Sequence, residues 1–360
     1  MESFFGILPW IFIYFVGIFN IRHNTRKTND IFFFILFIFS AIRYNVGFDY
    51  LNYEDLINFG NEHQLNRIEI FERYLINWSR LSFNQLFFIV NSFITIYFTK
   101  WALERISINL SISALVFVCF PLMFSNSMNI IRFWTALSII FYASSILLEE
   151  GFKPLRKFLV FVSFTIIAIC FHKAALVGLL FIPLCKINVP IFINILILLI
   201  GFVGGEFVLS KIMSGVFSDI LFADAVERYV NKDHQSDGLS KIPYLYLIFD
   251  VICLTRYKII KAYSERAYKY LTIFNIGTSL MFLLSFQVTL ASRISMPFIL
   301  YFLGLIPLFA EKHMYSIHIT RKTKNIIIEV ICFVLLIYLI TITNETIGKS
   351  QFLPYQIFLL

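Results

Sequence analysis

Long, uninterrupted runs of apolar residues constrain this chain more than any other feature. Residues 3–21 read SFFGILPWIFIYFVGIFNI, and similar runs recur to the end of the sequence. Hydrophobic residues make up 59% of the chain and charged residues 14%, whereas soluble domains carry roughly 45–50% and 25%. No water-soluble core buries such a share. We therefore predict an all-α, polytopic integral membrane protein, and the continuous runs disfavour a transmembrane barrel.

The apolar runs divide into about twelve candidate spans, with ten to fourteen as the expected range. We treat residues 1–360 as one polytopic membrane domain, without a separate soluble domain. The candidate spans are 3–21, 30–43, 82–100, 111–125, 129–148, 156–171, 173–186, 190–206, 242–256, 271–290, 293–310 and 325–342.

The distribution of charge between the spans predicts their orientation. With the N-terminus outside, more than half of the 30 Lys and Arg residues fall in the inner connections, and the acidic residues favour the outer side. Lys and Arg are retained on the cytoplasmic side of membrane proteins. We predict that both termini lie outside. The formal charge of +8 then reflects topology, and we expect no nucleic-acid partner.

Two long external segments remain, at 44–81 and 207–241. The first is polar with apolar residues at helical spacing, which predicts amphipathic helices at the membrane interface after the second span. The second ends in the polar run NKDHQSDGLSK. Such loops often carry function, although a solvated connector is the alternative for each.

Cationic residues gather at the outer ends of the spans. Arg43 ends the second span, Arg132 opens the fifth, His172 and Lys173 separate the sixth and seventh, and Arg293 separates the tenth and eleventh. Each charge within a span costs about 2.5–3.5 kcal/mol at its centre. A single residue of this kind is explained by snorkelling to the headgroups. Several at one depth predict a shared anionic ligand.

Arginine binds phosphate oxygens through its planar guanidinium and stays charged in an apolar site. Because the site lies at the membrane surface, a lipid-linked phosphate or pyrophosphate is the expected ligand. Arg73 adds a cation in the first external segment, while Tyr44, Tyr53 and Asn129 are placed to contact sugars. Interfacial belt residues are the alternative explanation for such aromatic side chains.

The sequence resembles a known family, the EpsG-like branch of Wzy-type polysaccharide polymerases. The similarity lies in ordered, individually weak motifs spread over nearly the whole chain. They are RYNVGFDYLNY at 43–53, FERYLINWSRL at 71–81, NIIRFWTALSIIFYASSILLE at 129–149, FHKAALVGLLFIPL at 171–184, SRISMPFILYFLGLIP at 292–307 and LPYQIF at 353–358. The chain departs from the family pattern at Phe133, where Gln is common, and at Lys173, where a small polar residue is common.

The resemblance implies a function in the synthesis of capsule, exopolysaccharide or O-antigen. Such proteins join repeat units carried on undecaprenyl pyrophosphate at the outer face of the bacterial cytoplasmic membrane. The growing chain leaves its lipid and is transferred to a new lipid-linked unit. The implied partners are the lipid-linked oligosaccharide and, in the same membrane, a flippase and a chain-length regulator.

Glycosyl transfer from a pyrophosphate requires a stabilised leaving group and a base for the acceptor hydroxyl. Arg132 and Arg293 are the candidates for the leaving group. Asp49 or His172 is the candidate base, and Gly47 allows Asp49 to fold back toward Arg43. Alternatively, Arg43 and Asp49 form only a structural ion pair, and His172 makes only a helix-end hydrogen bond.

We predict no metal and no cofactor, because no DxD motif or cluster of metal ligands stands near these residues. The five cysteines lie in apolar runs without metal-binding spacing. Other functions remain open: a transporter or flippase of lipid-linked oligosaccharide, a glycan ligase, or a membrane acyltransferase. A flippase would favour charges along a path through both leaflets, in which Asp250 and Glu329 are the deeper acids.

Overall fold

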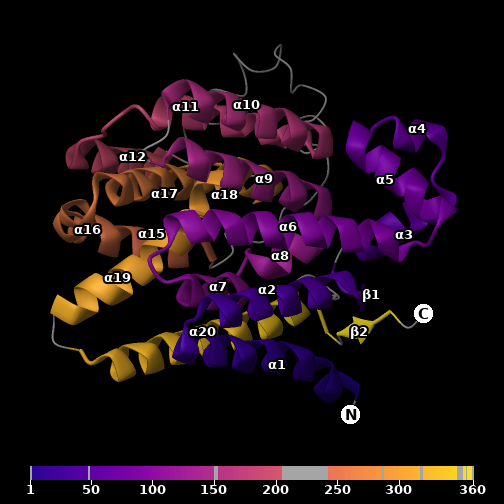
Figure 1. The fold of residues 1–360 in the computed structure, drawn as a ribbon, viewed down its shortest axis with the longest axis horizontal. Coiled ribbons are helices and arrows are strands. Elements are labelled where there is room, and N and C mark those ends of the chain that lie inside the picture. Colours follow the sequence, from indigo (N-terminus) through magenta and orange to yellow (C-terminus); the bar gives the residue numbers. More distant parts are fainter. Residues whose placement is uncertain are drawn as a thin grey trace. The chain divides into compact units, whose positions relative to one another are not determined.

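The protein is described here by a computed structural model that covers most of its length. The described residues are 2–47, 49–149, 153–204, 242–284, 288–316, 319–346, 352–353 and 355–358. The expected external segment 207–241 lies outside them. The described chain is helical almost throughout, which confirms the all-α prediction (Figure 1). It divides into two compact units, unit 1 (Met1–Ile182 and Ile306–Leu360) and unit 2 (Pro183–Leu305).

Unit 1 is built around α9, which packs between α6 and α10. The interior face of α9 is apolar and small, with Ala136, Ala143 and Ile140 all buried, so its neighbours approach closely. The helices of this unit are α1 (Glu2–His23), α2 (Arg26–Ala41), α3 (Tyr50–Phe59), α4 (Glu62–Leu65), α5 (Ile70–Leu81), α6 (Gln85–Ile106), α7 (Leu110–Cys119), α8 (Phe124–Asn129), α9 (Ile131–Leu147), α10 (Pro154–Phe171), the 3₁₀ helix η1 (Lys173–Leu180) and α20 (Arg321–Thr346).

Unit 2 is built around α17, which packs against each of the other helices of the unit. Gly201 lets α12 approach α17 closely, because a Cβ atom there would lie 2.6 Å from the backbone of Ser279. The helices of this unit are α12 (Ile191–Gly204), α15 (Ile242–Thr255), α16 (Tyr257–Tyr263), α17 (Glu265–Leu283) and α18 (Val288–Ile299). The chain passes between the units within α11 (Phe181–Leu184) and α19 (Phe302–Ser316).

Length and composition of the helices identify a polytopic membrane protein. Among the described residues, four helical stretches are long and apolar enough to cross a membrane: Gly6–His23, Gln85–Ile106, Pro154–Phe171 and Arg293–Lys312. Shorter apolar helices accompany them at Leu110–Cys119, Ile131–Leu147, Lys173–Leu184, Ile191–Gly204 and Ile242–Thr255. Helices lie at all twelve predicted ranges, while twelve complete crossings stay a prediction.

One predicted boundary between spans is wrong. We expected a tight connection at 291–292, directly before Arg293. These residues lie inside α18, which runs from Val288 to Ile299. The boundary comes earlier, because α17 ends at Leu283 and α18 begins at Val288. A second interruption, at Leu300 and Tyr301, separates α18 from α19. It lies just after Pro297, which has no backbone N–H to donate within the helix.

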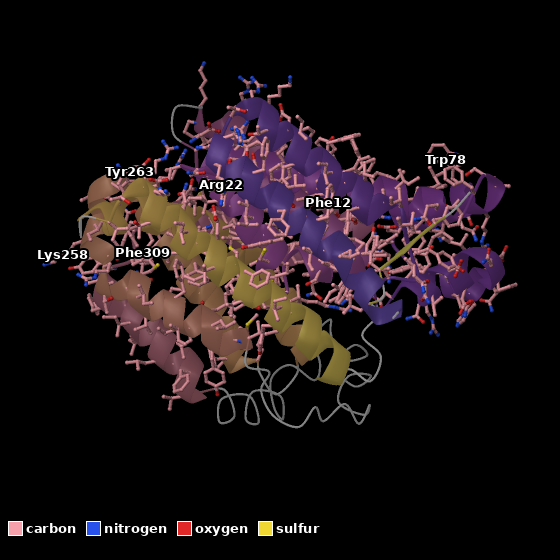
Figure 2. The ribbon with its side chains drawn as sticks, turned by 90° about the horizontal axis from the view of Figure 1, so that it is seen from below. Phe12, Arg22, Trp78, Lys258, Tyr263 and Phe309 are labelled. Atoms are coloured by element: carbon pink, nitrogen blue, oxygen red, sulfur yellow. The ribbon has the colours of Figure 1, made fainter. Side chains whose placement is uncertain are left out.

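The expected amphipathic segment at 44–81 contains three helices, α3, α4 and α5. On α5, Glu72, Leu75, Ile76 and Ser79 are buried at the spacing of one helix face. The opposite face exposes large aromatic residues, among them Trp78, which is 60% exposed (Figure 2). An exposed aromatic face on a short helix is typical of a helix lying at the membrane interface.

A side chain of α5 joins this segment together. Arg80 donates to the backbone carbonyls of Ile57 at 2.7 Å, Leu56 at 2.6 Å and Gly60 at 2.5 Å. These are the carbonyls at the end of α3, which have no partner within the helix. Arg80 therefore caps α3 and fixes its position against α5.

The C-terminal segment adds a small element that the sequence pattern did not predict. Residues Gln356–Ile357 (β2) pair antiparallel with Arg43–Tyr44 (β1), with Arg43 opposite Ile357 (Figure 1). The ring of Tyr355 stacks on Phe39 at 4.0 Å, and its hydroxyl donates to the Phe39 carbonyl. The C-terminal segment is thereby joined to the end of α2 and to the loop that follows it.

Candidate functional site

The centre of the candidate site is Arg132, in the first turn of α9. Its Nη1 donates to Glu69 Oε2 at 2.7 Å, and its Nε donates to the hydroxyl of Tyr53 at 3.1 Å. The guanidinium also lies 5.9 Å from the centre of the Tyr53 ring. The side chain of Arg132 remains 24% exposed. Its Nη2 makes no hydrogen bond with any described residue, so two N–H groups are open to a ligand.

Glu69 connects Arg132 to the connection between α10 and η1. Its second oxygen, Oε1, accepts the backbone N–H of Lys173 at 3.1 Å. This N–H belongs to the first turn of η1 and has no partner within the helix. The Lys173 side chain is exposed, and its ammonium contacts no polar group in the described part of the chain. Glu69 therefore brings two of the predicted cations together.

His172 is the C-cap of α10 and the N-cap of η1. Its Nδ1 accepts the backbone N–H of Ala174 at 3.1 Å, and its ring meets Phe133 edge to face at 5.7 Å. Since Nδ1 is an acceptor here, the neutral ring carries its proton on Nε2. The helix-end hydrogen bond that we considered as the alternative for His172 is therefore present. A role of His172 as the general base stays a prediction.

Behind Arg132 lies a fully buried carboxyl group, Glu72 on α5. Its Oε2 accepts from Asn91 Nδ2 at 3.3 Å, and Asn91 Oδ1 accepts from the Thr135 hydroxyl at 2.6 Å. Glu72 Oε1 has no hydrogen-bond partner among the described residues. Burial raises the pKa of Glu72 to about 8, against the opposing effect of nearby Arg132. Glu72 is therefore held largely protonated at neutral pH.

Arg43 lies in a different environment from Arg132. It is 1% exposed. Its Nε donates to Val46 O at 3.2 Å, Nη2 donates to Met128 O at 3.5 Å, and Nη1 donates to the backbone and hydroxyl of Ser40. The guanidinium lies 5.3 Å from the centre of the Phe88 ring. In this position Arg43 shapes the loop after α2, and contact with a substrate stays a prediction.

The loop after α2 packs against the segment that leads to Arg132. Gly47 has φ +101°, and a Cβ atom there would lie 2.5 Å from the carbonyl oxygen of Met128. The same Cβ would lie 3.2 Å from Asn129 Oδ1. A side chain is excluded by both the backbone conformation and the space. The glycine therefore allows the predicted loop residues to lie beside the start of α9.

The remaining predicted residues of unit 1 surround this loop. Asp49 is the N-cap residue of α3, where its side chain makes no capping bond, and its charge acts on Tyr53. Tyr44 is exposed, with its ring 5.7 Å from that of Tyr50. Arg73 donates to Asn66 Oδ1 at 2.8 Å on the exposed side of α5. Arg73 thus lies on the same helix as Glu72 but contacts a different element.

Arg293 is half-buried in α18 and belongs to unit 2. Within unit 1, Arg132 contacts Tyr53 directly and is linked to Lys173 through Glu69. Arg43 and Gly47 contact the segment before α9, whereas Arg73 contacts Asn66 outside this set. A joint site of Arg293 and Arg132 stays a prediction.

Sequence reasoning missed Glu69 and Glu72 as members of the site. Both are acids on the external segment 44–81, which was treated as amphipathic and therefore as solvated. A signal existed in their spacing: Glu69 and Glu72 lie three apart at the start of α5, on one face of that helix. The sequence did not show which acidic residue of the segment contacts Arg132, because that depends on the fold.

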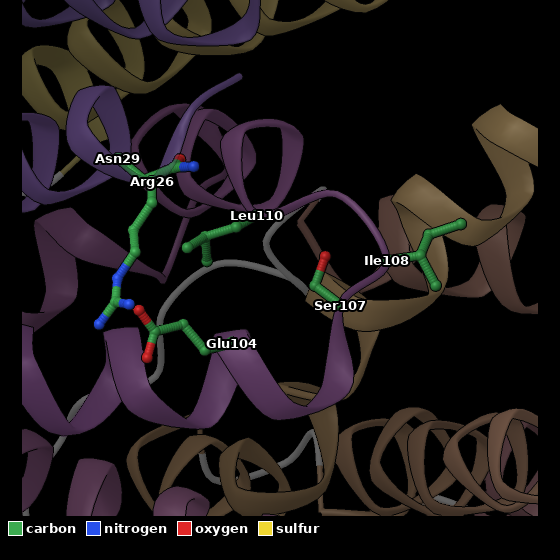
Figure 3. A pocket seen from close by; sticks show the side chains of 6 residues that line it. All are labelled: Arg26, Asn29, Glu104, Ser107, Ile108 and Leu110. Carbon is green, nitrogen blue, oxygen red and sulfur yellow. The ribbon is translucent and has the colours of Figure 1, made fainter.

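A separate pocket lies at the other end of α6, about 20 Å along the helix from Asn91. It is lined by Arg26, Asn29, Glu104, Ser107, Ile108 and Leu110. In Figure 3 the side chains of Arg26 and Glu104 point toward each other across it. None of the predicted site residues lines this pocket. The candidate site is therefore the Arg132 cluster, by which we mean Arg132 and the residues around it described above.

Comparisons with known proteins agree with the motif resemblance. A profile of the EpsG family matches residues 30–357. The match spans the external segment, the whole Arg132 cluster, Arg293 and the C-terminal strand. No curated protein and no solved structure matches the chain.

Proposed function

The chain belongs to the EpsG family, which is linked to exopolysaccharide biosynthesis, and from this premise we propose that it is a polysaccharide polymerase. Its substrate is an oligosaccharide repeat unit carried on undecaprenyl pyrophosphate. It transfers the growing chain from one carrier to the next unit at the outer face of the bacterial cytoplasmic membrane. The products are capsular, exopolysaccharide or O-antigen chains.

The observation that supports this proposal is that only some of the N–H donors of the Arg132 guanidinium have hydrogen-bond partners among the described residues. Tyr53 and Glu69 accept from Nε and Nη1, and Nη2 makes no hydrogen bond with the described residues. The two N–H donors of this nitrogen suit the oxygens of a phosphate, and Glu69 also binds the backbone of Lys173, whose side chain is exposed. Because the aromatic residues of α5 are exposed on the same segment, the ligand is expected to be held in lipid.

The reaction uses this cationic group on the leaving pyrophosphate. The acceptor hydroxyl oxygen attacks the anomeric carbon, the bond from that carbon to the pyrophosphate oxygen breaks, and the hydroxyl proton passes to a base. Arg132 binds the negative charge that develops on the departing oxygen, with Arg293 as a second donor. Preorganised donors of this kind contribute about 2.7–4 kcal/mol each.

The hydrogen bonding of His172 narrows the choice of base. Its Nδ1 accepts the Ala174 N–H, so in the neutral ring Nε2 carries the proton and is the donor. His172 then acts on the phosphate or on a sugar oxygen. Asp49, half-buried at the start of α3, is the better candidate for taking the acceptor proton.

The topology belongs to the same proposal. About twelve spans with both termini outside place Arg132, His172 and the 44–81 helices at the outer face, where the lipid-linked unit is presented. A flippase delivers that unit and a chain-length regulator limits the product. The Tyr44 ring and Asn129 contact the sugars, and Arg73 adds to the charge that attracts the carrier.

The test is a gene deletion complemented with Arg132→Ala at matched membrane expression. Surface glycan and lipid-linked intermediates are then separated on a gel. We expect the long-chain ladder to be lost while single lipid-linked units still reach the outside. Arg67→Ala is the matched control, because Arg67 is an exposed arginine of the same segment that contacts only His63.

Two results would contradict the proposal. An unchanged ladder in Arg132→Ala cells would remove Arg132 from the reaction. Accumulation of the lipid-linked units inside the cell would instead indicate transport across the membrane as the function.

A further inference from the structure

Glu69 occupies the position on Arg132 that a phosphate oxygen would take. Its Oε2 lies 2.7 Å from Nη1 of Arg132. Carboxylate and phosphate oxygens bind a guanidinium in the same geometry. A ligand that used both terminal nitrogens of Arg132 would therefore have to replace this carboxylate.

We propose that Glu69 is an internal counterion of Arg132 that the lipid pyrophosphate displaces when the donor binds. This inference rests on the proposed function. It describes how the anion site is neutralised in the resting protein and made available to the ligand. In the resting protein Glu69 neutralises Arg132. In the donor complex the pyrophosphate neutralises Arg132, and Glu69 stays on the adjacent backbone.

The contacts around the pair allow such an exchange. The side chains of Arg132 and Glu69 are 24% and 14% exposed, so an anion can reach the pair from outside. The pair consists of a single hydrogen bond, from Nη1 to Oε2. A ligand that binds two guanidinium nitrogens with higher charge can therefore compete with the carboxylate.

Each partner has a second contact that survives the exchange. Arg132 remains held by Tyr53, whose hydroxyl accepts from Nε at 3.1 Å. Glu69 remains held by the Lys173 N–H at 3.1 Å. The guanidinium therefore keeps its orientation, and the freed carboxylate keeps a hydrogen bond.

The charges around the pair favour a ligand with more than one negative charge. A monoanion would replace Glu69 without a net gain, because one carboxylate charge is exchanged for another. A pyrophosphate brings additional charge, which the exposed Lys173 can bind. The exchange therefore selects the pyrophosphate end of the carrier over singly charged lipid headgroups.

Removing the charge of Glu69 separates this role from a structural one. The full-length protein is placed in phosphatidylcholine nanodiscs, and inorganic pyrophosphate binding is measured by calorimetry. If Glu69 competes with the ligand, Glu69→Gln binds pyrophosphate about tenfold more tightly than the wild type, a change of about 1.4 kcal/mol. A purely structural role predicts equal or weaker binding.

Three variants complete the measurement. Glu62→Gln is the matched control, because Glu62 is an exposed acid on α4 without contact to Arg132, and it should bind as the wild type does. Glu69→Asn repeats the test if the Gln variant does not fold. In the double variant with Arg132→Ala, the tighter binding should disappear, since the competition requires Arg132.

The outcomes distinguish the two proposals. Equal or weaker binding by folded Glu69→Gln, with Arg132→Ala still losing affinity, overturns the counterion role and leaves the proposed function intact. If Arg132→Ala binds pyrophosphate as tightly as the wild type, the anion site itself is misassigned and both proposals fail.

Discussion

Arg43 and Arg132 occupy equivalent places in the sequence pattern but different places in the molecule. Both follow or open an apolar run at the same predicted depth. Arg43 is 1% exposed, and all three of its nitrogen atoms donate to protein oxygens. Arg132 is partly exposed, and one of its nitrogen atoms makes no hydrogen bond with the described residues.

The difference shows what separates a structural arginine from a ligand-binding one. Arg43 holds its loop because each of its three nitrogen atoms donates to a carbonyl or hydroxyl oxygen of the protein. Arg132 is anchored at Nε and Nη1 but open at Nη2. The number of donor nitrogen atoms that already have protein partners, and not the presence of charge, therefore separates a structural arginine from a ligand-binding one.

Arg43→Ala is expected to have the largest effect and to act on folding. It removes a buried side chain and leaves the carbonyls of Val46 and Met128 without donors, at a cost of about 3–5 kcal/mol. The yield of folded protein and its melting temperature in detergent measure this loss. A melting temperature close to that of the wild type would place Arg43 with the ligand-binding group.

Arg132→Ala is expected to act on transfer instead. Loss of a donor to the leaving group should lower polymer formation by about 100-fold or more, while stability should fall less than in Arg43→Ala, because Arg132 is partly exposed and Arg43 is buried. Polymerisation in membrane vesicles and thermal unfolding of the same preparation test both halves. A loss of stability as large as that of Arg43→Ala would mean that the two arginines do not differ in their structural role.

Glu72 provides a pH test of the region behind Arg132. Its pKa in the folded protein is about 8, above the ordinary value of 4.5. The folded state therefore keeps a proton that the unfolded state releases between these values, so this carboxyl makes stability fall as pH rises from 4.5 to 8. The loss is about 5 kcal/mol at most.

Glu72→Gln should remove this dependence, because the amide is neutral throughout. Unfolding of wild type and variant is compared at pH 5, 6.5 and 8. Parallel curves across that range would mean that Glu72 is not protonated in the folded protein.

Gly47→Ala tests the contact between the Arg43 loop and the start of α9. The residue has φ +101° and its Cβ would meet the Met128 carbonyl, at a cost of about 1–3 kcal/mol. We expect lower stability together with a shorter glycan ladder, because the loop supports both regions. Gly60→Ala on the distal side of the segment is the control for the ladder, since it should affect stability alone.

Tyr355→Phe is the smallest expected change. It removes the hydroxyl that donates to the Phe39 carbonyl but keeps the stacked ring, at a cost of about 0.5–1.5 kcal/mol. The melting temperature should fall slightly and polymer formation should persist. Loss of polymer at full stability would instead give the C-terminal strand a direct part in the site.

The positions of helices followed from the sequence because burial in lipid forces every apolar run to satisfy its own backbone. The boundary near Arg293 did not, because the charge of Arg293 does not mark a helix end: Arg293 lies inside α18, which begins at Val288. The strand pairing of Gln356 with Tyr44 also escaped prediction. Two residues carry no recognisable period, and their partners lie at opposite ends of the chain.

Within the site, the cations were predictable and their partners were not. A charge at the end of an apolar run is costly and therefore conspicuous, which identified Arg132 and His172. Glu69 lies in a polar segment where an acid has no cost, and its three-residue spacing to Glu72 did not show which residue it contacts. Its contact with Arg132 arises only because α5 packs against α6 and α10, the two helices that flank α9.

The sequence by itself determined a polytopic helical membrane protein, its family and the cationic residues at the ends of its apolar runs. Those features depend on the cost of placing each residue type in lipid, which is a property of composition and order. The tertiary structure alone decided that Arg43 is saturated, that Arg132 is open, and that Glu69 lies on it. Hydrogen-bond saturation depends on which acceptors long-range packing brings within about 3 Å, and no local pattern encodes that.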